Sequence, residues 1–136
     1  KLLKELDMFG PLQEMIKNGL PTLATCAGLI LLAEQLENDD THHLATLPVT
    51  VRRNAYGRQL GSFTTVANAG DITDFPMVFI RAPFITSTGD NVKILSRVDS
   101  NIIAVEYRNQ IGMSFHPEMS DDTRLHKYFI KKIREK

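Results

Sequence analysis

Residues 21–33 read PTLATCAGLILLA, and this stretch indicates the fold class. Its first part, Pro21–Thr25, predicts a short buried strand. Its second part predicts a helix that starts at Ala27 and continues through Leu36 to the polar cluster Asn38-Asp39-Asp40. A strand that turns at once into a helix is typical of α/β proteins, in which helices pack on a sheet.

Further helices are predicted near both ends of the chain. Leu2, Leu3 and Leu6 have helical spacing, and a second helical segment is expected between Gly10-Pro11 and Asn18-Gly19, with proline in its first turn. Close to the C-terminus, Ser120-Asp121-Asp122 should cap a last helix. Its apolar stripe would consist of Leu125, Phe129 and Ile133.

Six strands are predicted in the middle of the chain, separated by Gly, Asn, Asp and Pro. They are Leu47–Arg53, Gly61–Ala67, Met77–Arg81, Val92–Val98, Ile102–Tyr107 and Ile111–Phe115. Residues 1–136 therefore predict one α/β domain. Two helical segments precede the first strand, whereas a doubly wound sheet normally begins with a strand, so we expect part of this domain to lie before Lys1.

The composition narrows the class of protein. The 136 residues include 16 Lys and Arg and 16 Asp and Glu, giving a net charge of zero, which argues against a nucleic-acid-binding role. The longest apolar run, Leu29–Ala33, is far shorter than the ~20 residues of a membrane span, and the chain shows no secretion signal. We therefore expect a cytoplasmic protein with neither a nucleic-acid nor a membrane partner.

Cys26, the only cysteine, stands where the predicted strand meets the predicted helix. A nucleophile at such a turn is held out of the sheet, the helix N-terminus lowers its pKa, and the N–H of Ala27 can bind an oxyanion. The small residues Ala27 and Gly28 would let a substrate approach. The alternative is a buried structural cysteine, since free cysteine is among the most buried residue types.

A second motif, Ser114-Phe115-His116-Pro117-Glu118, ends the last predicted strand. Residues two apart on an extended segment face the same way, so the Glu118 carboxylate can orient the His116 imidazole, as in a Cys–His–acid arrangement. The alternative is a histidine that caps the following helix. Both motifs lie at carboxyl ends of predicted strands, where sites form in open α/β sheets.

Four segments together resemble the class I glutamine amidotransferases. They are Thr25-Cys26-Ala27-Gly28 with the apolar run after it, Arg53-Asn54-Ala55-Tyr56-Gly57-Arg58-Gln59, Phe79-Ile80-Arg81-Ala82-Pro83, and Ser114-Phe115-His116-Pro117-Glu118. The segment at residues 53–59 is the most specific, and it is similar to that of the glutaminase-subunit family of pyridoxal 5′-phosphate synthase. The resemblance runs in order from Lys1 to the C-terminus.

The resemblance implies a three-layer, flavodoxin-like fold, with a mixed, mostly parallel sheet and helices on both faces. It implies hydrolysis of the side-chain amide of L-glutamine, with Cys26 as nucleophile, His116 and Glu118 completing the triad, and Ala27 at the oxyanion. It also implies glutamine-binding positions, which are Arg53, Ile80 and Arg81. A guanidinium suits the α-carboxylate of glutamine, and a backbone group such as that of Ile80 can orient the substrate.

The resemblance further implies a partner, a (β/α)₈-barrel synthase subunit that receives the ammonia within a large hetero-oligomer. The amide step needs no metal or organic cofactor. The N-terminal strands of the family, with a Gly-Gly-Glu-Ser loop that supplies a second oxyanion donor, would lie before Lys1. A chain of these 136 residues alone is therefore expected to fold poorly and to be nearly inactive.

Three positions depart from the family pattern, which usually has glycine at Ala24, glutamate at Thr64 and often histidine at Phe84. None belongs to the triad. The extra methyl group of Ala24 should be tolerated if the φ angle there is negative. Two other functions stay open, namely a cysteine hydrolase of the same superfamily acting on another substrate, and a regulatory subunit without activity. The intact triad argues against the second, and residues 53–59 argue against the first.

Two remaining clusters of residues predict solvent-exposed segments rather than functional sites. His42-His43 beside Asp39-Asp40 could suggest a metal, but adjacent histidines point apart, so a solvated loop is expected. The basic residues of the last helix predict a solvated face whose charge suits the helix dipole. They are Lys127, Lys131, Lys132, Arg134 and Lys136.

Overall fold

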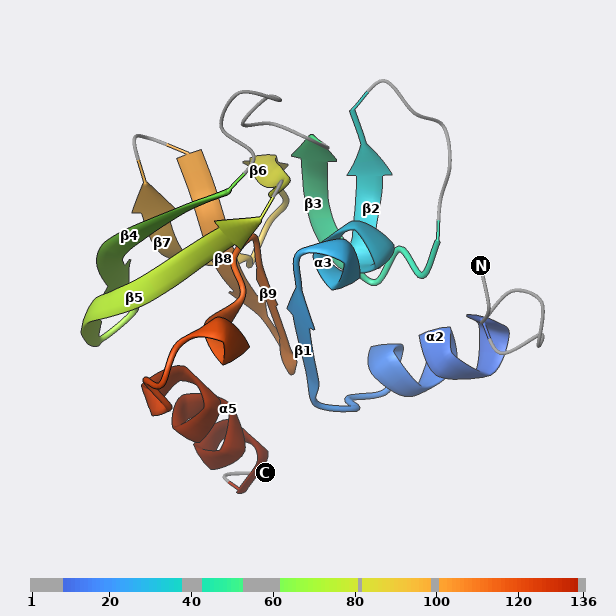
Figure 1. The fold of residues 1–136 in the computed structure, drawn as a ribbon. Helices are drawn as coiled ribbons and strands as arrows, with labels where there is room; N and C mark the ends of the chain where they lie inside the picture. Colours follow the sequence, from blue (N-terminus) through green and yellow to red (C-terminus); the bar gives the residue numbers. More distant parts are fainter. Residues whose placement is uncertain (1–8, 38–42, 53–61, 81, 99–100, 135–136) are drawn as a thin grey trace.

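The computed structural model describes residues 9–37, 43–52, 62–80, 82–98 and 101–134 (Figure 1). Its elements, in chain order, are α2 (Phe9–Lys17), β1 (Thr22–Thr25), α3 (Ala27–Leu32), β2 (Ala33–Leu36), β3 (Leu47–Arg52), β4 (Ser62–Ala69), β5 (Ile72–Ile80), β6 (Phe84–Thr88), β7 (Lys93–Val98), β8 (Asn101–Tyr107), β9 (Gln110–Met113), the 3₁₀ helix η1 (Pro117–Met119) and α5 (Arg124–Arg134). The helical segment predicted from Leu2, Leu3 and Leu6 lies outside the described residues.

The main sheet has the strand order β1-β9-β8-β6-β3-β2, with β7 paired to β8, and β4 and β5 form a separate hairpin. The pairs β1–β9 and β2–β3 are parallel, whereas β3–β6, β6–β8, β7–β8 and β8–β9 are antiparallel. The expected mixed sheet of an α/β fold is confirmed. Antiparallel pairs nevertheless outnumber parallel ones in the described part of the chain, unlike the expected mostly parallel sheet, because β6 to β9 follow one another without a crossover helix.

Two apolar cores lie on opposite faces of this sheet. On β9, Ile111 and Met113 belong to the core that includes β5 and α5, whereas a Cβ added to Gly112 would come within 2.9 Å of Leu29 and Leu47 in the other core. The side chains of successive strand residues alternate between faces, so α3 and α5 cover different faces (Figure 1). The expected helices on both faces are confirmed.

The helix predicted from Ala27 to Leu36 ends early, and this prediction is wrong in its second half. The helix α3 stops at Leu32, and Ala33 to Leu36 form β2, which pairs in parallel with β3. In β2 the end residues Ala33 and Leu36 are buried and the two between them are exposed. Burial at positions i and i+3 fits a helix as well as this strand, so pairing with β3 overrides the local pattern.

All six predicted strands are present within the described residues, with shifted ends. The strand β5 begins at Ile72, before the expected Met77, and it contains Pro76, which is tolerated because β5 pairs with a strand on one edge only. Phe84–Thr88 form β6, which the sequence analysis missed. Its run of Thr86, Ser87 and Thr88 before Gly89 has the composition of a loop, so only its place between β3 and β8 makes it a strand.

The helix between Gly10-Pro11 and Asn18-Gly19 is confirmed as α2, and the C-terminal helix as α5. Asp122 Oδ1 accepts a hydrogen bond from the Arg124 N–H at 3.0 Å, which supports the predicted start of α5. Leu125 is buried and Phe129 packs on the same core, as predicted, but Ile133 is 40% exposed, and Tyr128 also packs on this core. In the described part of the chain, no helix has the length and apolarity that crossing a membrane requires.

The predicted solvated face of α5 is wrong for Lys132. Its ammonium pairs with the Glu106 carboxylate on β8, and the Tyr128 hydroxyl donates a hydrogen bond to the same carboxylate at 2.5 Å. Partial burial would raise the pKa of Glu106, but the hydrogen bonds from Lys132 and Tyr128 outweigh it and lower the pKa. Because the segment is rich in basic residues, its sequence does not distinguish Lys132, whose ion pair holds α5 against the sheet.

Candidate active site

Cys26 occupies the turn between β1 and α3, as the sequence predicts. Its backbone angles are φ 48° and ψ −104°, a region that non-glycine residues rarely adopt. The Cys26 N–H donates a hydrogen bond to the carbonyl of Met113 at 2.8 Å, so the strained turn is fastened to the end of β9. This geometry turns the side chain of Cys26 out of the strand direction and agrees with a nucleophile at a strand-to-helix turn.

The Cys26 thiol is half-buried, and its Sγ lies 3.7 Å from the carbonyl oxygen of Ile80. Burial raises the pKa of the thiol and the Glu118 charge adds to this, while a hydrogen bond from the Ala27 N–H lowers it. The net pKa is raised, contrary to the lowering expected from the helix N-terminus, because the desolvation of the sulfur outweighs the Ala27 donor. A base is therefore needed to remove the thiol proton.

His116 and Glu118 form a direct pair after the end of β9. His116 Nδ1 lies 2.7 Å from Glu118 Oε2, and the His116 N–H donates to the Val78 carbonyl at 2.8 Å. Burial opposes ionisation of Glu118, but its own backbone N–H and the His116 side chain together lower the pKa of the carboxyl. Glu118 is thus held as a carboxylate that orients the imidazole.

The capping alternative for His116 finds no support in this geometry. His116 stands at the N-cap position of η1, yet its side chain makes no capping hydrogen bond. The ring contacts Glu118 instead. The predicted face-sharing of residues two apart is therefore confirmed.

The parallel pairing of β1 with β9 brings the two motifs together. Thr25 lies opposite Met113, so Cys26 and His116 both follow the carboxyl ends of neighbouring parallel strands. The Glu118 charge acts on the pKa of Cys26, which places the carboxylate within electrostatic reach of the thiol. The predicted meeting of both motifs at one edge of the sheet is confirmed.

The small residues beside Cys26 are explained by packing. A Cβ added to Gly28 would lie 3.3 Å from the Cβ of Ala24, so any larger side chain there would press α3 away from β1. Ala24 itself is 6% exposed within β1. Its φ angle is negative, which is the condition under which its extra methyl group was expected to be tolerated. Gly28 thus permits close contact of helix and strand.

Not every predicted site residue can be placed. Ile80, at the end of β5, is 38% exposed, and its carbonyl faces the thiol. Arg53 and Arg81 lie outside the described residues, as does most of the His42-His43 cluster with its two aspartates. Among the described residues, no three His, Cys, Asp or Glu side chains gather as metal ligands would.

The sequence analysis named the Ile80 backbone but missed two other backbone groups that hold the site. The carbonyls of Met113 and Val78 accept hydrogen bonds from Cys26 and His116, yet every residue type has a carbonyl. No residue pattern could have identified these two. They follow only from the positions of β5 and β9.

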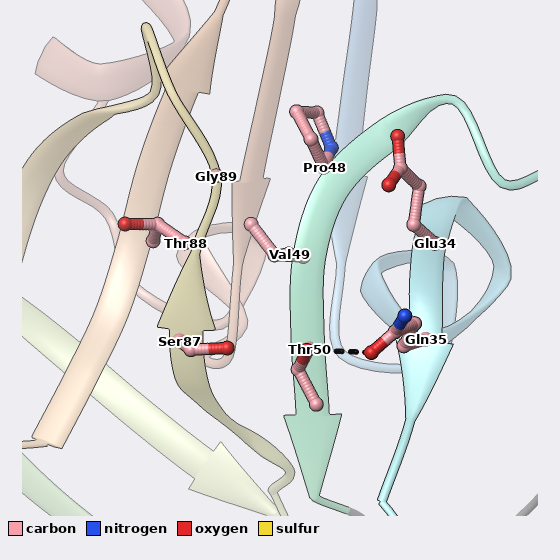
Figure 2. Close-up of a pocket in the computed structure, with 8 residues that line it drawn as sticks. All are labelled: Glu34, Gln35, Pro48, Val49, Thr50, Ser87, Thr88 and Gly89. Carbon is pink, nitrogen blue, oxygen red and sulfur yellow. Dashed lines mark hydrogen bonds between the residues drawn. The ribbon is translucent and has the colours of Figure 1, made fainter.

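A separate depression between β2, β3 and β6 has different chemistry (Figure 2). Its volume is about 200 Å³, and Gln35 and Thr50 hydrogen-bond across its floor at 3.4 Å. Its described lining has hydroxyl and amide groups and one carboxylate, Glu34, with neither cysteine nor histidine. Cys26 and His116 lie elsewhere, at the carboxyl ends of β1 and β9.

The sequence profile of the SNO glutamine amidotransferase family matches residues 1–135. Among curated proteins, the chain is 61% identical over 133 residues to the pyridoxal 5′-phosphate synthase subunit PdxT of Desulfitobacterium hafniense (strain DSM 10664 / DCB-2), covering 98% of this chain and 67% of that protein. It is 49% identical over 136 residues to the subunit of the same name from Streptococcus pneumoniae (strain CGSP14), covering 100% and 70%.

Solved structures agree with the sequence relatives. A crystal structure of a glutamine amidotransferase superposes with a TM-score of 0.91 at 34% identity, covering 96% of this chain and 70% of that one. A putative GMP synthase component from Thermoplasma acidophilum superposes with a TM-score of 0.55 at 16% identity, covering 95% of this chain and 63% of that one, and shares the fold only. The fold expected from the resemblance is confirmed.

Proposed function

Because the chain belongs to the SNO glutamine amidotransferase family, we propose that the Cys26 site carries out its glutaminase reaction. The protein hydrolyses the side-chain amide of L-glutamine and supplies ammonia for pyridoxal 5′-phosphate synthesis. Residues 1–136 belong to one glutaminase domain. The observation that carries the assignment is the joint placement of Cys26 and the His116–Glu118 pair at the ends of β1 and β9.

The reaction begins with removal of the Cys26 proton by His116. The resulting thiolate attacks the amide carbon, and the N–H of Ala27, the residue after the nucleophile, stabilises the oxyanion. His116 then returns a proton to the nitrogen, so ammonia leaves and a γ-glutamyl thioester remains. His116 next takes a proton from a water molecule that hydrolyses the thioester, which yields glutamate and the free thiol.

Glu118 supports the imidazole in both charge states. Its carboxylate accepts from Nδ1, so Nε2 is left as the nitrogen that exchanges protons with the thiol and the leaving group. The lowered pKa of Glu118 keeps this carboxylate charged when His116 carries its extra proton. Glu118 is an orienting acid and not a proton donor.

Glutamine is held by Arg53, Ile80 and Arg81. A guanidinium forms two parallel hydrogen bonds with an α-carboxylate, and the Ile80 carbonyl beside the thiol can orient a substrate donor. Replacing either arginine with Ala should mainly raise KM, and Lys should restore it incompletely. Direct binding that is unchanged, with a loss only in kcat, would exclude this role.

The partner is the synthase subunit that consumes the ammonia. The relatives from Desulfitobacterium hafniense and Streptococcus pneumoniae are named as subunits of pyridoxal 5′-phosphate synthase. By analogy, this chain assembles with a (β/α)₈-barrel synthase subunit in a large hetero-oligomer. The amide chemistry uses only side chains and water, so the reaction needs no metal or organic cofactor.

Replacement of the nucleophile tests the assignment. Cys26→Ala and Cys26→Ser in the full-length protein, assayed with the synthase subunit, should lose glutaminase activity because neither side chain forms a thiolate. Melting temperature and circular dichroism check that each variant is folded. Near-normal ammonia release by folded Cys26→Ala would refute the proposed site.

A further inference from the structure

The backbone of strand β5 contacts two members of the proposed triad, His116 and Cys26. The Val78 carbonyl accepts the hydrogen bond from the His116 N–H at 2.8 Å, and the Ile80 carbonyl lies 3.7 Å from Cys26 Sγ. Carbonyls two residues apart on a strand point to the same edge. The edge of β5 that faces away from β4 therefore runs along the catalytic segments.

Phe79 stands between these two carbonyls. Its side chain is fully buried, and its ring centroid lies 5.8 Å from that of Phe115 at an interplanar angle of 62°. Phe115 immediately precedes His116 in the chain. One ring thus supports the residue before His116, while the backbone on either side of it holds His116 and Cys26.

We propose that Phe79 is a positioning residue for the glutaminase reaction. Its ring, packed edge-on against Phe115, fixes the distance between the β5 edge and the ends of β1 and β9. At that distance the Val78 and Ile80 carbonyls hold His116 and Cys26 in register. The inference rests on the proposed function, since it takes these two residues as the base and the nucleophile.

The steric reason is the volume of the ring. The Phe79 ring fills the space between β5 and Phe115, and a smaller side chain would let β5 settle into the vacated volume. The two carbonyls would move with the strand. Small displacements at reacting groups have large effects on rate.

Phe75 provides a matched control on the same strand. It is also fully buried, it points to the same face as Phe79, and its ring centroid lies 6.0 Å from that of Phe115. The carbonyl beside it, that of Asp74, accepts from the Arg124 side chain on α5. Phe75 therefore shares the Phe115 contact of Phe79, but the carbonyl beside it holds α5 instead of Cys26 or His116.

The test compares Phe79→Leu with Phe75→Leu in the full-length protein, assayed together with the synthase subunit. The assay temperature lies well below the melting temperature of the less stable variant. Both variants should lose similar thermal stability. Only Phe79→Leu should lower kcat, by about 10-fold or more, with KM for glutamine changing less than about threefold. Phe75→Leu should keep kcat within about twofold.

Thiol reactivity gives a readout independent of turnover. Cys26 is the only cysteine in these 136 residues, so the rate of its alkylation by iodoacetamide, with the adduct located by peptide mass spectrometry, reports its environment. Phe79→Leu should change this rate by about threefold or more, whereas Phe75→Leu should leave it unchanged. If Phe79→Leu fails to fold, Phe79→Met, a flexible side chain that is likewise smaller than the ring, carries the same expectation.

Each outcome decides the proposal. Equal effects of the two leucine variants on kcat and on alkylation would overturn the positioning role of Phe79 and leave only core packing. If Cys26→Ala is inactive at the same time, the proposed function stands and this inference alone fails. Normal activity of Cys26→Ala would overturn both.

Discussion

Two of the described carboxylates that accept a hydrogen bond from a basic side chain, Glu118 at the candidate site and Glu106 on β8, differ in exposure. In the pair at the site, the side chains of His116 and Glu118 are 22% and 52% exposed. In the pair between α5 and β8, those of Lys132 and Glu106 are 22% and 15% exposed, and Tyr128 adds a second donor. The two ion pairs thus have similar contacts, but the pair at the site is accessible to solvent and the pair between α5 and β8 is more enclosed.

The difference in exposure separates chemistry from stability. An accessible ion pair contributes roughly 0–1 kcal/mol to folding, because water competes for both partners. In an enclosed pair, the loss of one partner leaves the other without its counter-charge, which costs more. Substitutions at His116 and Glu118 should therefore act on activity, and substitutions at Glu106 on stability.

The largest effect is expected from His116→Asn. In the proposed reaction both proton transfers pass through the imidazole, so kcat should fall by about 10²–10⁴-fold, while the melting temperature should change little because the pair is accessible. His43→Asn is the matched control, since His43 is also half-buried and lies outside the site. Ammonia release by both variants, measured with the synthase subunit, decides the case. Equal losses of ammonia release in the two variants would show that His116 has no special role in the reaction.

Glu118→Gln should have a smaller effect on the same reaction. The amide keeps the shape of the carboxylate and loses its charge, so the imidazole remains in place but its protonated form is less stabilised. We expect kcat to fall by about 10- to 100-fold, less than for His116→Asn. A loss as complete as that of His116→Asn, in a folded variant, would assign Glu118 a direct role in proton transfer.

The placement of the candidate site residues was more predictable from the sequence than the ends of the elements around them. Cys26, His116 and Glu118 were chosen because each stands in a short motif whose chemistry requires those side chains. The end of α3 was missed because burial of Ala33 and Leu36 fits a helix and a strand equally well. Such an ambiguity is resolved only by β3, a strand remote from the motif.

Contacts between distant segments account for the other errors. Lys132 belongs to a basic run typical of a solvated face, and only the approach of β8 makes it the partner of Glu106. The carbonyl of Val78 holds His116, and its role depends on where β5 lies rather than on its side chain. The sequence therefore predicted the placement of Cys26, His116 and Glu118 better than the contacts that support them.

Glu106→Gln should sharpen the comparison from the stability side. Lys132 would lose its counter-charge and Tyr128 a charged acceptor, so we expect the free energy of unfolding to fall by about 1–3 kcal/mol. The matched control is Glu37→Gln, whose partner Arg52 is 52% exposed and whose loss should cost less than about 0.5 kcal/mol. Urea denaturation of both variants measures the difference, and kcat of the folded enzymes should be unchanged.

The last and smallest effect is the dependence of this difference on pH. The folded-state pKa of Glu106 lies below its ordinary value of 4.5, because the Lys132 and Tyr128 hydrogen bonds outweigh the burial that would raise it. A carboxyl with a lowered pKa binds its proton less readily in the folded state than in the unfolded state. Its contribution to stability is therefore present above about pH 4.5 and is lost as the pH falls through the folded value. Urea denaturation at pH 7, 5, 4 and 3 should show the difference between the natural protein and Glu106→Gln constant down to about pH 5 and shrinking below it. A difference that stays constant to pH 3 would mean that the Glu106 charge does not stabilise the α5 contact, and that its packing alone ties the helix to the sheet.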